Sequence, residues 1–152
     1  QLAEQSARRQ LAEESLHTIT HDLKLALEAS RAGTWNWWFD TNRITWDATH
    51  CALFGMTPDE FKGTYDAVMA CVHPDDCERL KQTLEQCKEQ DTFHDLEYRV
   101  IWPDSSEHMM AAHGRVYRDL KTGQPIKMAG VCLDITERKK LEQERMEALE
   151  QA

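Results

Sequence analysis

The spacing of apolar and polar residues changes several times along this chain, and each spacing predicts a different element. Residues 1–31 contain no proline or glycine and repeat apolar residues at a heptad spacing, which predicts one long helix. Gly33 is expected to end that helix, as a glycine after the last turn commonly does. Residues 48–72 are broken repeatedly by glycine and proline and predict short helical pieces.

Two segments after the first helix predict a β-hairpin. Residues 34–40 and 43–47 are rich in Trp, Thr and Ile, and the pair Thr41-Asn42 lies between them. Asn tolerates the positive φ of a tight turn, so the pair suits a short connection between antiparallel strands.

A second long helix is predicted to begin at His73-Pro74-Asp75-Asp76. Proline suits the first helical position, and the two acids face the positive end of the helix dipole. The following residues place one apolar face on a helix of roughly four turns. That face consists of Cys77, Leu80, Leu84 and Cys87.

Three further strands are predicted at 93–102, 107–118 and 127–135. The last is apolar on both faces, which is typical of a central strand covered on both sides. The predicted order of elements is a helix, two strands, several helices, three strands and a final helix. This order predicts an α+β domain with a five-stranded antiparallel sheet. In the first of the three strands, alternation places one set of residues on one face: His94, Leu96, Tyr98, Val100 and Trp102.

The N-terminal helix carries an a/d seam, which favours pairing of two helices because each apolar knob buries against a partner. The alternative is a single amphipathic helix packed on its own domain. Arg9 and Gln5 make the seam weak at its N-terminal end. The predicted dimer contacts are Leu2, Leu16, Ile19, Leu23 and Ala26.

The charge balance excludes some partners. The chain has 18 basic and 27 acidic residues and a net charge of −9. Nucleic acids and anionic membrane surfaces both require a basic surface, so neither is an expected partner. No apolar run approaches the ~20 residues that span a bilayer.

The five cysteines are odd in number and form no CxxC pair. A disulfide framework is therefore disfavoured, and a reducing cytoplasm is the expected location. The chain starts at Gln1 without a signal peptide and reads as a fragment, so a membrane anchor elsewhere in its parent protein fits equally well.

Three separated segments resemble the PAS family of sensory domains. Residues 33–37 with 43–46 resemble its opening hairpin, and 72–76 resemble the start of its long helix. Residues 97–99 and the closing run Asp134-Ile135-Thr136-Glu137-Arg138 resemble its third and fifth strands. The motifs occur in order and at fitting separations, and the resemblance covers about residues 25–138.

The resemblance implies helices on one face of a curved sheet that can enclose a ligand pocket. It divides the chain into a connector helix (1–31), a sensory domain (32–136) and a signalling helix (137–152). It also implies a homodimer, coupled by Asp134, Ile135 and Thr136 to a linked output domain such as a histidine kinase or diguanylate cyclase. Family position and strand face predict the pocket residues: Trp37, Trp46, Phe54, Phe61, Met69, Leu80, Leu84, Tyr98 and Met110.

The chain departs from the family pattern in several places. Asp104-Ser105 stands where the third turn normally has Asp-Gly, and His108-Met109 stands where Arg-Trp is usual. Trp38 replaces the usual Asp. The flavin–cysteine motif of light-sensing relatives is missing, as is the CxxCH of covalent haem, so neither chemistry is expected.

Several cofactors and two function classes stay open. A b-type haem needs an axial ligand such as His94, Cys77 or Cys87, although a structural role is the simpler interpretation of each. Unattached flavin needs an aromatic pocket, but aromatic residues also fill ordinary cores. Scattered His and Cys residues do not predict a metal site. No catalytic residues are predicted, and the module is expected either to sense a small molecule or redox cue or to serve as a cofactor-free scaffold.

The last segment, 137–152, pairs opposite charges three or four residues apart, which supports an exposed helix. Its apolar seam is thin. Two helix registers of similar energy would make it a bistable element, as signalling requires.

Overall fold

The computed structural model describes residues 1–90 and 94–152, and the side chains of these except 94 and 95. The chain forms two compact units, residues 1–31 and residues 32–152. The predicted residue Phe93 and the side chain of His94 lie outside this description.

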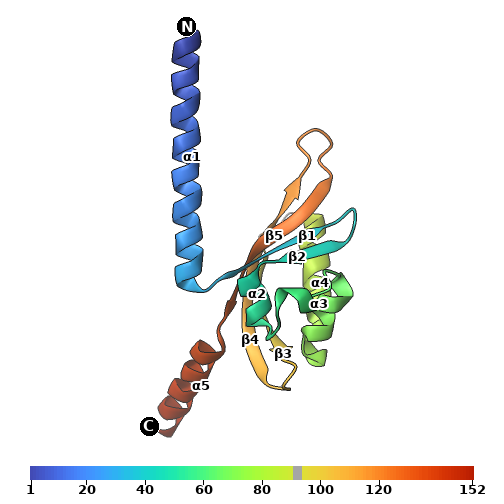
Figure 1. Cartoon of the computed structure of the whole chain (residues 1–152). Coiled ribbons are helices and arrows are strands. Elements are labelled where there is room, and N and C mark those ends of the chain that lie inside the picture. The colour runs from blue at the N-terminus through green and yellow to red at the C-terminus, as the bar shows by residue number, and fades with distance from the viewer. Residues whose placement is uncertain (91–93) are drawn as a thin grey trace. The chain divides into compact units, whose positions relative to one another are not determined.

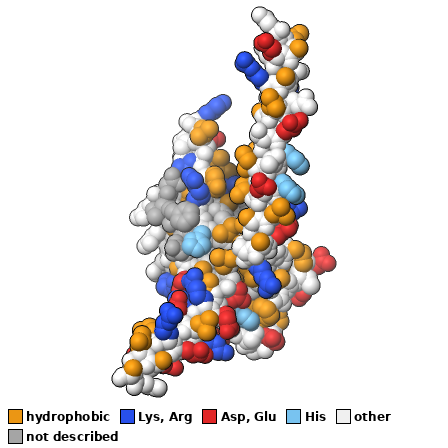
Figure 2. All heavy atoms as spheres, turned by 90° about the vertical axis from the view of Figure 1, so that its left-hand side faces the viewer, with side chains coloured by type: hydrophobic (Ala, Val, Ile, Leu, Met, Phe, Trp, Pro, Cys, Tyr) orange, Lys and Arg blue, Asp and Glu red, His pale blue; other side chains and the backbone are white. Residues whose placement is uncertain are grey.

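The first unit is helix α1, Leu2–Ser30, and none of its residues is buried. Figure 2 shows apolar side chains exposed along this helix among acidic, basic and histidine side chains. The predicted helix is confirmed, but the prediction that Gly33 ends it was wrong. Arg31 takes the left-handed conformation with φ 59°, and its N–H closes the last turn on Glu28 O.

The second unit contains a five-stranded sheet in the order β2-β1-β5-β4-β3, with every pair antiparallel (Figure 1). Asn42 adopts φ 56° in the first hairpin, as predicted, and Ser105 adopts φ 71° in the turn where the family resemblance implies glycine. The strands are β1 Gly33–Trp38, β2 Arg43–Trp46, β3 His94–Ile101, β4 Glu107–Arg118 and β5 Pro125–Asp134.

Helices gather on one side of this sheet (Figure 1) and bury its inner face. Helix α5, Thr136–Gln151, follows the last strand and begins one residue before the predicted boundary. The predicted α+β class with an antiparallel sheet is thereby confirmed. The covering elements are α2 Ala48–Leu53, η1 Pro58–Glu60, α3 Tyr65–Cys71 and α4 Pro74–Gln90.

Strand β5 is central in the sheet, as its apolar sequence predicts, but the expectation that both its faces are covered was wrong. Met128 and Cys132 point into the core and are fully buried. Ala129, Val131 and Leu133 alternate with them and are only half-buried. The reason is that α2, α3 and α4 all pack on one face, so the apolar residues on the other face have no helix packed over them within residues 32–152.

Gly33 has a packing role instead of a capping role. A Cβ added at this position would lie 2.5 Å from the Cα of His50, so only glycine lets α2 approach β1 this closely. This close approach brings α2 against the sheet.

Candidate functional site

A small cavity of about 60 Å³ lies between the inner face of the sheet and helices α2, α3 and α4. Its lining is almost entirely apolar. Six of the nine predicted pocket residues line it: Trp37, Trp46, Met69, Leu80, Leu84 and Tyr98. Phe54 and Met110 are buried elsewhere in the core, and Phe61 stacks on Trp46 with centroids 3.7 Å apart.

Six other residues line the cavity and were missed from the sequence. Trp35 shares the inward face of β1 with Trp37, and Ala112 shares the inward face of β4 with Met110, so alternation contains a signal for both. The two-turn helices α2 and α3 are too short to show a face by periodicity. The full set is Trp35, Ile44, His50, Tyr65, Val68 and Ala112.

His50 is the most unusual of these residues because it is polar and only 2% exposed. Its ring stacks on Trp46, with centroids 4.2 Å apart, and on Phe54, at 4.9 Å, and the centroids of those two rings lie 4.5 Å from each other. Its Nδ1 has no hydrogen-bond partner among the described residues. Burial lowers its pKa to about 3, so the imidazole is neutral at physiological pH.

Several other polar atoms of the lining residues have hydrogen-bond partners within the protein. Trp35 Nε1 donates to Val131 O at 3.2 Å, and Trp37 Nε1 donates to Asn42 Oδ1 at 2.7 Å. The hydroxyl of Tyr98 has a thiol contact to Cys132 Sγ at 3.9 Å. Burial raises the pKa of Tyr98 well above its usual value, so its hydroxyl stays protonated.

The Asp-Ile-Thr segment joins the sheet to α5. Asp134 Oδ1 accepts from Thr136 N at 2.9 Å and from Thr136 Oγ1 at 2.6 Å. Thr136 Oγ1 in turn accepts from Met109 N at 2.8 Å, and Ile135 N donates to Met109 O at 2.8 Å. The start of α5 is therefore bonded directly to strand β4.

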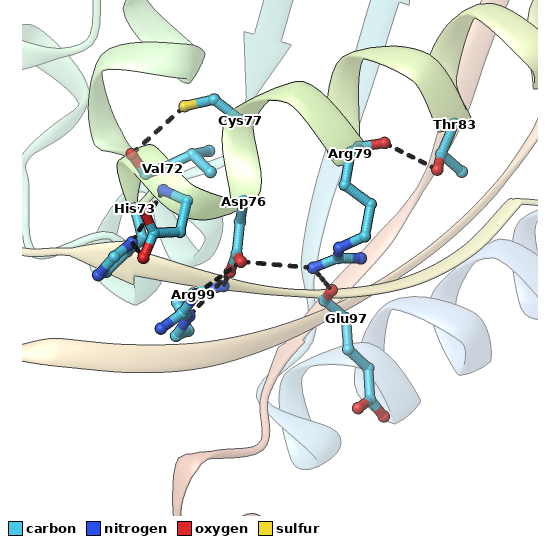
Figure 3. A network of polar contacts seen from close by, with 9 residues as sticks. Val72, His73, Asp76, Cys77, Arg79, Thr83, Glu97 and Arg99 are labelled. Carbon is cyan, nitrogen blue, oxygen red and sulfur yellow. Dashed lines mark hydrogen bonds and ion pairs between the residues drawn. The ribbon is translucent and has the colours of Figure 1, made fainter.

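A buried carboxylate ties α4 to β3 (Figure 3). Asp76 accepts from Arg99 N at 2.8 Å, Arg99 Nε at 3.0 Å and Arg99 Nη2 at 2.8 Å. These hydrogen bonds lower the pKa of Asp76 to about 2. The prediction that Asp76 serves the helix start therefore missed its main role, which is a tertiary ion pair. His73 caps the helix instead, with Nδ1 accepting from Asp75 N at 3.1 Å.

Strand β3 continues this connection to α5. Arg79 Nη2 donates to Glu97 O at 2.9 Å (Figure 3), and the Glu97 carboxylate lies 2.8 Å from Lys139 Nζ and 3.6 Å from Arg138 Nη2. These exposed ion pairs are individually weak, because water and salt screen them. Together they connect α4, β3 and α5 along one side of the domain.

A second connection runs from α2 to the same junction. Trp102 Nε1 donates to Leu53 O at 3.0 Å, and the Trp102 ring stacks on His108 with centroids 3.9 Å apart. His108 Nδ1 lies 3.8 Å from Asp134 Oδ2, and its Nε2 lies 2.8 Å from Ser106 Oγ. His108 is one of the departures from the family pattern, and it places an imidazole between Trp102 and Asp134.

The candidate haem and metal ligands do not converge on the cavity. Neither Cys77 nor Cys87 is among its lining residues, and Cys77 Sγ contacts backbone oxygens of Met69 and Val72. Burial raises the pKa of Cys87, which disfavours the thiolate that a metal requires. Within the described residues, no three His, Cys, Asp or Glu side chains form a group able to hold a metal ion.

Comparison with known proteins identifies the family. A family model described as PAS fold matches residues 43–132, more than half of the chain. The chain belongs to the PAS family. The resemblance predicted from its hairpin, long helix and Asp-Ile-Thr motifs is therefore confirmed.

Curated relatives of this PAS domain are large signalling proteins. Sensor protein FixL of Bradyrhizobium diazoefficiens is 27% identical over 119 residues, which span 78% of this chain and 23% of FixL. The probable diguanylate cyclase DgcE of Escherichia coli is 28% identical over 119 residues, spanning 78% of this chain and 10% of DgcE. The chain therefore spans less than a quarter of either relative.

Solved structures share the PAS fold. A sensory box histidine kinase/response regulator from Burkholderia thailandensis has a TM-score of 0.72 and 25% identity, covering 85% of this chain and 95% of that one. A second solved structure is the N-terminal domain of a diguanylate cyclase with a PAS/PAC sensor from Marinobacter aquaeolei. It has a TM-score of 0.64 and 20% identity, and the match covers 71% of this chain and 98% of that one. The second likeness concerns the fold alone.

No described helix of this PAS domain is long and apolar enough to cross a membrane.

Proposed function

We propose that this PAS domain relays a conformational signal from its core to an output domain of the histidine kinase or diguanylate cyclase type. The observation that carries this proposal is the pair of hydrogen bonds from Ile135 N to Met109 O and from Met109 N to Thr136 Oγ1, which fix the start of α5 to strand β4 of the sheet. In this proposal residues 1–31 and 137–152 are connectors, and residues 32–136 are the sensory domain. We assign no catalytic step to the chain.

The mechanism we propose is a population shift between two arrangements of α5. The contacts from α4 through Glu97 and those from α2 through Trp102 and His108 both end at the junction of β5 and α5. A change at the cavity that moves α2 or α4 would therefore alter both sets of contacts. Because α5 buries no residue of its own, small changes at its first turn suffice to change its register.

The cavity volume bears on what the domain senses. Ligand sites for drug-sized molecules and cofactors occupy about 300–1,000 Å³, whereas this cavity measures about 60 Å³. We therefore propose neither flavin nor haem for this chain. A small molecule, or a cofactor-free relay as the alternative, fits the cavity better. The odd number of cysteines and the lack of a CxxC pair support a cytoplasmic location.

Thr136→Val tests the relay because it removes the hydroxyl and keeps the shape of the side chain. Loss of the bond to Met109 N is expected to cost about 1 kcal/mol. Hydrogen–deuterium exchange, followed by mass spectrometry, should show amides in the first turns of α5 exchanging about fivefold faster. Upstream of a diguanylate cyclase domain, the same variant should change cyclase activity.

Thr83→Val is the matched control, because Thr83 Oγ1 donates to Arg79 O within its own helix. It should leave exchange in α5 unchanged. If Thr136→Val also left α5 and cyclase activity unchanged, the junction would not transmit a signal and the relay proposal would fail.

We further propose that α1 pairs with α1 of a second copy. All five predicted seam residues are exposed, with Leu16 at 65%, Ile19 at 56% and Leu23 at 60%. Exposed leucines and isoleucines at heptad spacing gain about 1.5–3 kcal/mol each when a partner buries them. A homodimer would bring two copies of the PAS domain, each with its own α5, into one assembly.

The double variant Leu16→Glu/Leu23→Glu is expected to convert the dimer into a monomer of 17.7 kDa. Size-exclusion chromatography with light scattering measures this mass. Leu11→Glu/Leu25→Glu is the control, since these leucines are 64% and 50% exposed but lie off the seam. Equal behaviour of the two double variants would show that the heptad seam does not hold the dimer.

A further inference from the structure

Helix α1 carries two histidines, His17 and His21, to which the proposed relay gives no role. They are four positions apart, so they lie on successive turns of one helix face, with Cβ atoms about 5–6 Å apart. Both side chains are exposed. Figure 2 shows histidine side chains next to each other on the surface of this helix. The helix therefore presents a pair of imidazoles to the solvent.

The protein does not occupy either imidazole. Among the described residues, neither His17 nor His21 forms a hydrogen bond, an ion pair or a ring contact. Thr20 directs its hydroxyl to Leu16 O at 2.8 Å, and Glu13, one turn before His17, pairs with Arg9 at 3.2 Å. Both imidazoles are therefore accessible to a ligand from solution.

The spacing of the two imidazoles selects the class of ligand. Two histidines four positions apart on one helix can bind the same metal ion, as they do in an H-E-x-x-H helix. Imidazole suits Zn²⁺, Cu²⁺ and Ni²⁺, whereas Mg²⁺ and Ca²⁺ require oxygen ligands. Once one imidazole holds the ion, the second binds intramolecularly and strengthens the attachment. The pair therefore favours a divalent transition-metal ion.

The protein supplies two ligands to such an ion, and water supplies the others. Within the part of the chain that the structure describes, no third His, Cys, Asp or Glu completes a metal-holding group. Structural zinc sites have four protein ligands, so their spacing rules did not select this pair from the sequence. Glu14 and Lys24, one turn before and one turn after the pair, carry opposite charges. The two imidazoles alone therefore determine which ion binds.

The histidine pair lies away from the predicted dimer seam. At about 100° per residue, both histidines lie more than about 120° around the helix from the centre of the seam formed by Leu16, Ile19 and Leu23. A metal ion on this face leaves the seam free. Binding of metal and pairing of two α1 helices are therefore compatible.

We propose that His17 and His21 bind one divalent transition-metal ion, which joins two successive turns of α1. Helix α1 buries no residue, so it gains little stability from packing. An ion that binds only the helical conformation, at 100 times its dissociation constant, favours that conformation by about 100-fold. The binding does not rest on the proposed relay, whereas any effect on dimer formation rests on the proposed pairing of α1.

Calorimetric titration of the whole chain with Ni²⁺ tests the site, since Ni²⁺ suits imidazole and does not oxidise the cysteines. One Ni²⁺ per chain is expected, with weaker binding of Mn²⁺ and none of Mg²⁺. His21→Gln should weaken Ni²⁺ binding about tenfold or more, because only one imidazole remains. Half an ion per chain would show that Ni²⁺ bridges two chains, and would overturn the proposal.

The double variant His21→Asp/Asp22→His is the matched control. It keeps the composition and the net charge but moves the second imidazole five positions from His17, off the shared face. It should lose as much affinity for Ni²⁺ as His21→Gln does. Wild-type affinity in this variant would show that other histidines hold the ion, and the site would be rejected.

Hydrogen–deuterium exchange measures the effect of the ion on α1. Saturating Ni²⁺ should slow amide exchange around His17 and His21 in the wild type and leave it unchanged in His21→Asp/Asp22→His. Binding without slower exchange would mean that the ion does not join the two turns.

The metal site and the dimer can fail separately. Leu16→Glu/Leu23→Glu should still bind one Ni²⁺ per chain, because the seam does not contribute a ligand. His21→Gln should keep the metal-free mass of the wild type in light scattering, because the seam is intact. Loss of Ni²⁺ binding in Leu16→Glu/Leu23→Glu would show that the site needs a second copy, and would overturn a site within one helix.

Discussion

Gly130→Ala is expected to destabilise the folded domain by about 3 kcal/mol or more, because its methyl group has no space. A Cβ at this position would lie 1.8 Å from His113 O and 2.6 Å from the Cα of Gly114. Both are backbone atoms of β4, which pairs with β5 at the centre of the sheet. No change of rotamer relieves such a clash, so the two central strands would have to separate.

Urea unfolding followed by tryptophan fluorescence measures this effect. All five tryptophans lie in residues 32–152, so the signal reports on the PAS domain without α1. Gly123→Ala is the control, because a Cβ there meets nothing within 4 Å although φ is +75°. It should cost only about 1 kcal/mol from its left-handed backbone. Similar costs for both variants would mean that β4 and β5 tolerate a wider separation.

Asp76→Ala is expected to lower the free energy of unfolding by about 3 kcal/mol. The substitution removes three hydrogen bonds to Arg99 and leaves its backbone N–H and guanidinium without their carboxylate. The Asp76 side chain is 10% exposed and that of Arg99 is 35% exposed, so partial solvation of the arginine keeps the cost at the low end for buried pairs. Asp75→Ala, with an exposed carboxylate, should cost less than about 0.5 kcal/mol.

Acid provides an independent check of the same ion pair. The pKa of Asp76 falls from 3.8 to about 2 on folding, so its carboxylate stabilises the folded state above pH 3.8. This contribution, about 2 kcal/mol, is lost as the pH falls from about 4 to about 2. The difference in stability between the wild type and Asp76→Ala should shrink by that amount over this range. A constant difference would show that packing, and not the charge, accounts for the effect.

The same ion pair affects the proposed relay. Asp76 and Arg99 join α4 to β3, and Arg79 and Glu97 extend that contact to α5. Loss of the Asp76 carboxylate should therefore weaken the attachment of α4 to β3, the strand whose Glu97 contacts α5.

Local sequence determined the elements of this protein. Heptad spacing in residues 1–31, alternation around Tyr98 and the turn at Asn42 each depend on neighbours a few residues away, and each predicted element was confirmed. The Asp-Ile-Thr motif is similarly local, because Asp134 and Thr136 bond to each other. The PAS family was predicted because several such motifs occur along the chain in the order typical of that family.

Only the tertiary structure decided what these elements do together. Asp76 looked like a helix-start residue because its partner Arg99 is 23 residues away. His50 gave no signal, since a helix of six residues is too short to reveal its buried face. The cavity volume is the small difference between two larger volumes, namely the volume enclosed by the sheet and the helices and the volume of the side chains that fill it. That difference depends on strand register and helix approach, including the close packing at Gly33, and no local pattern in the sequence encodes it.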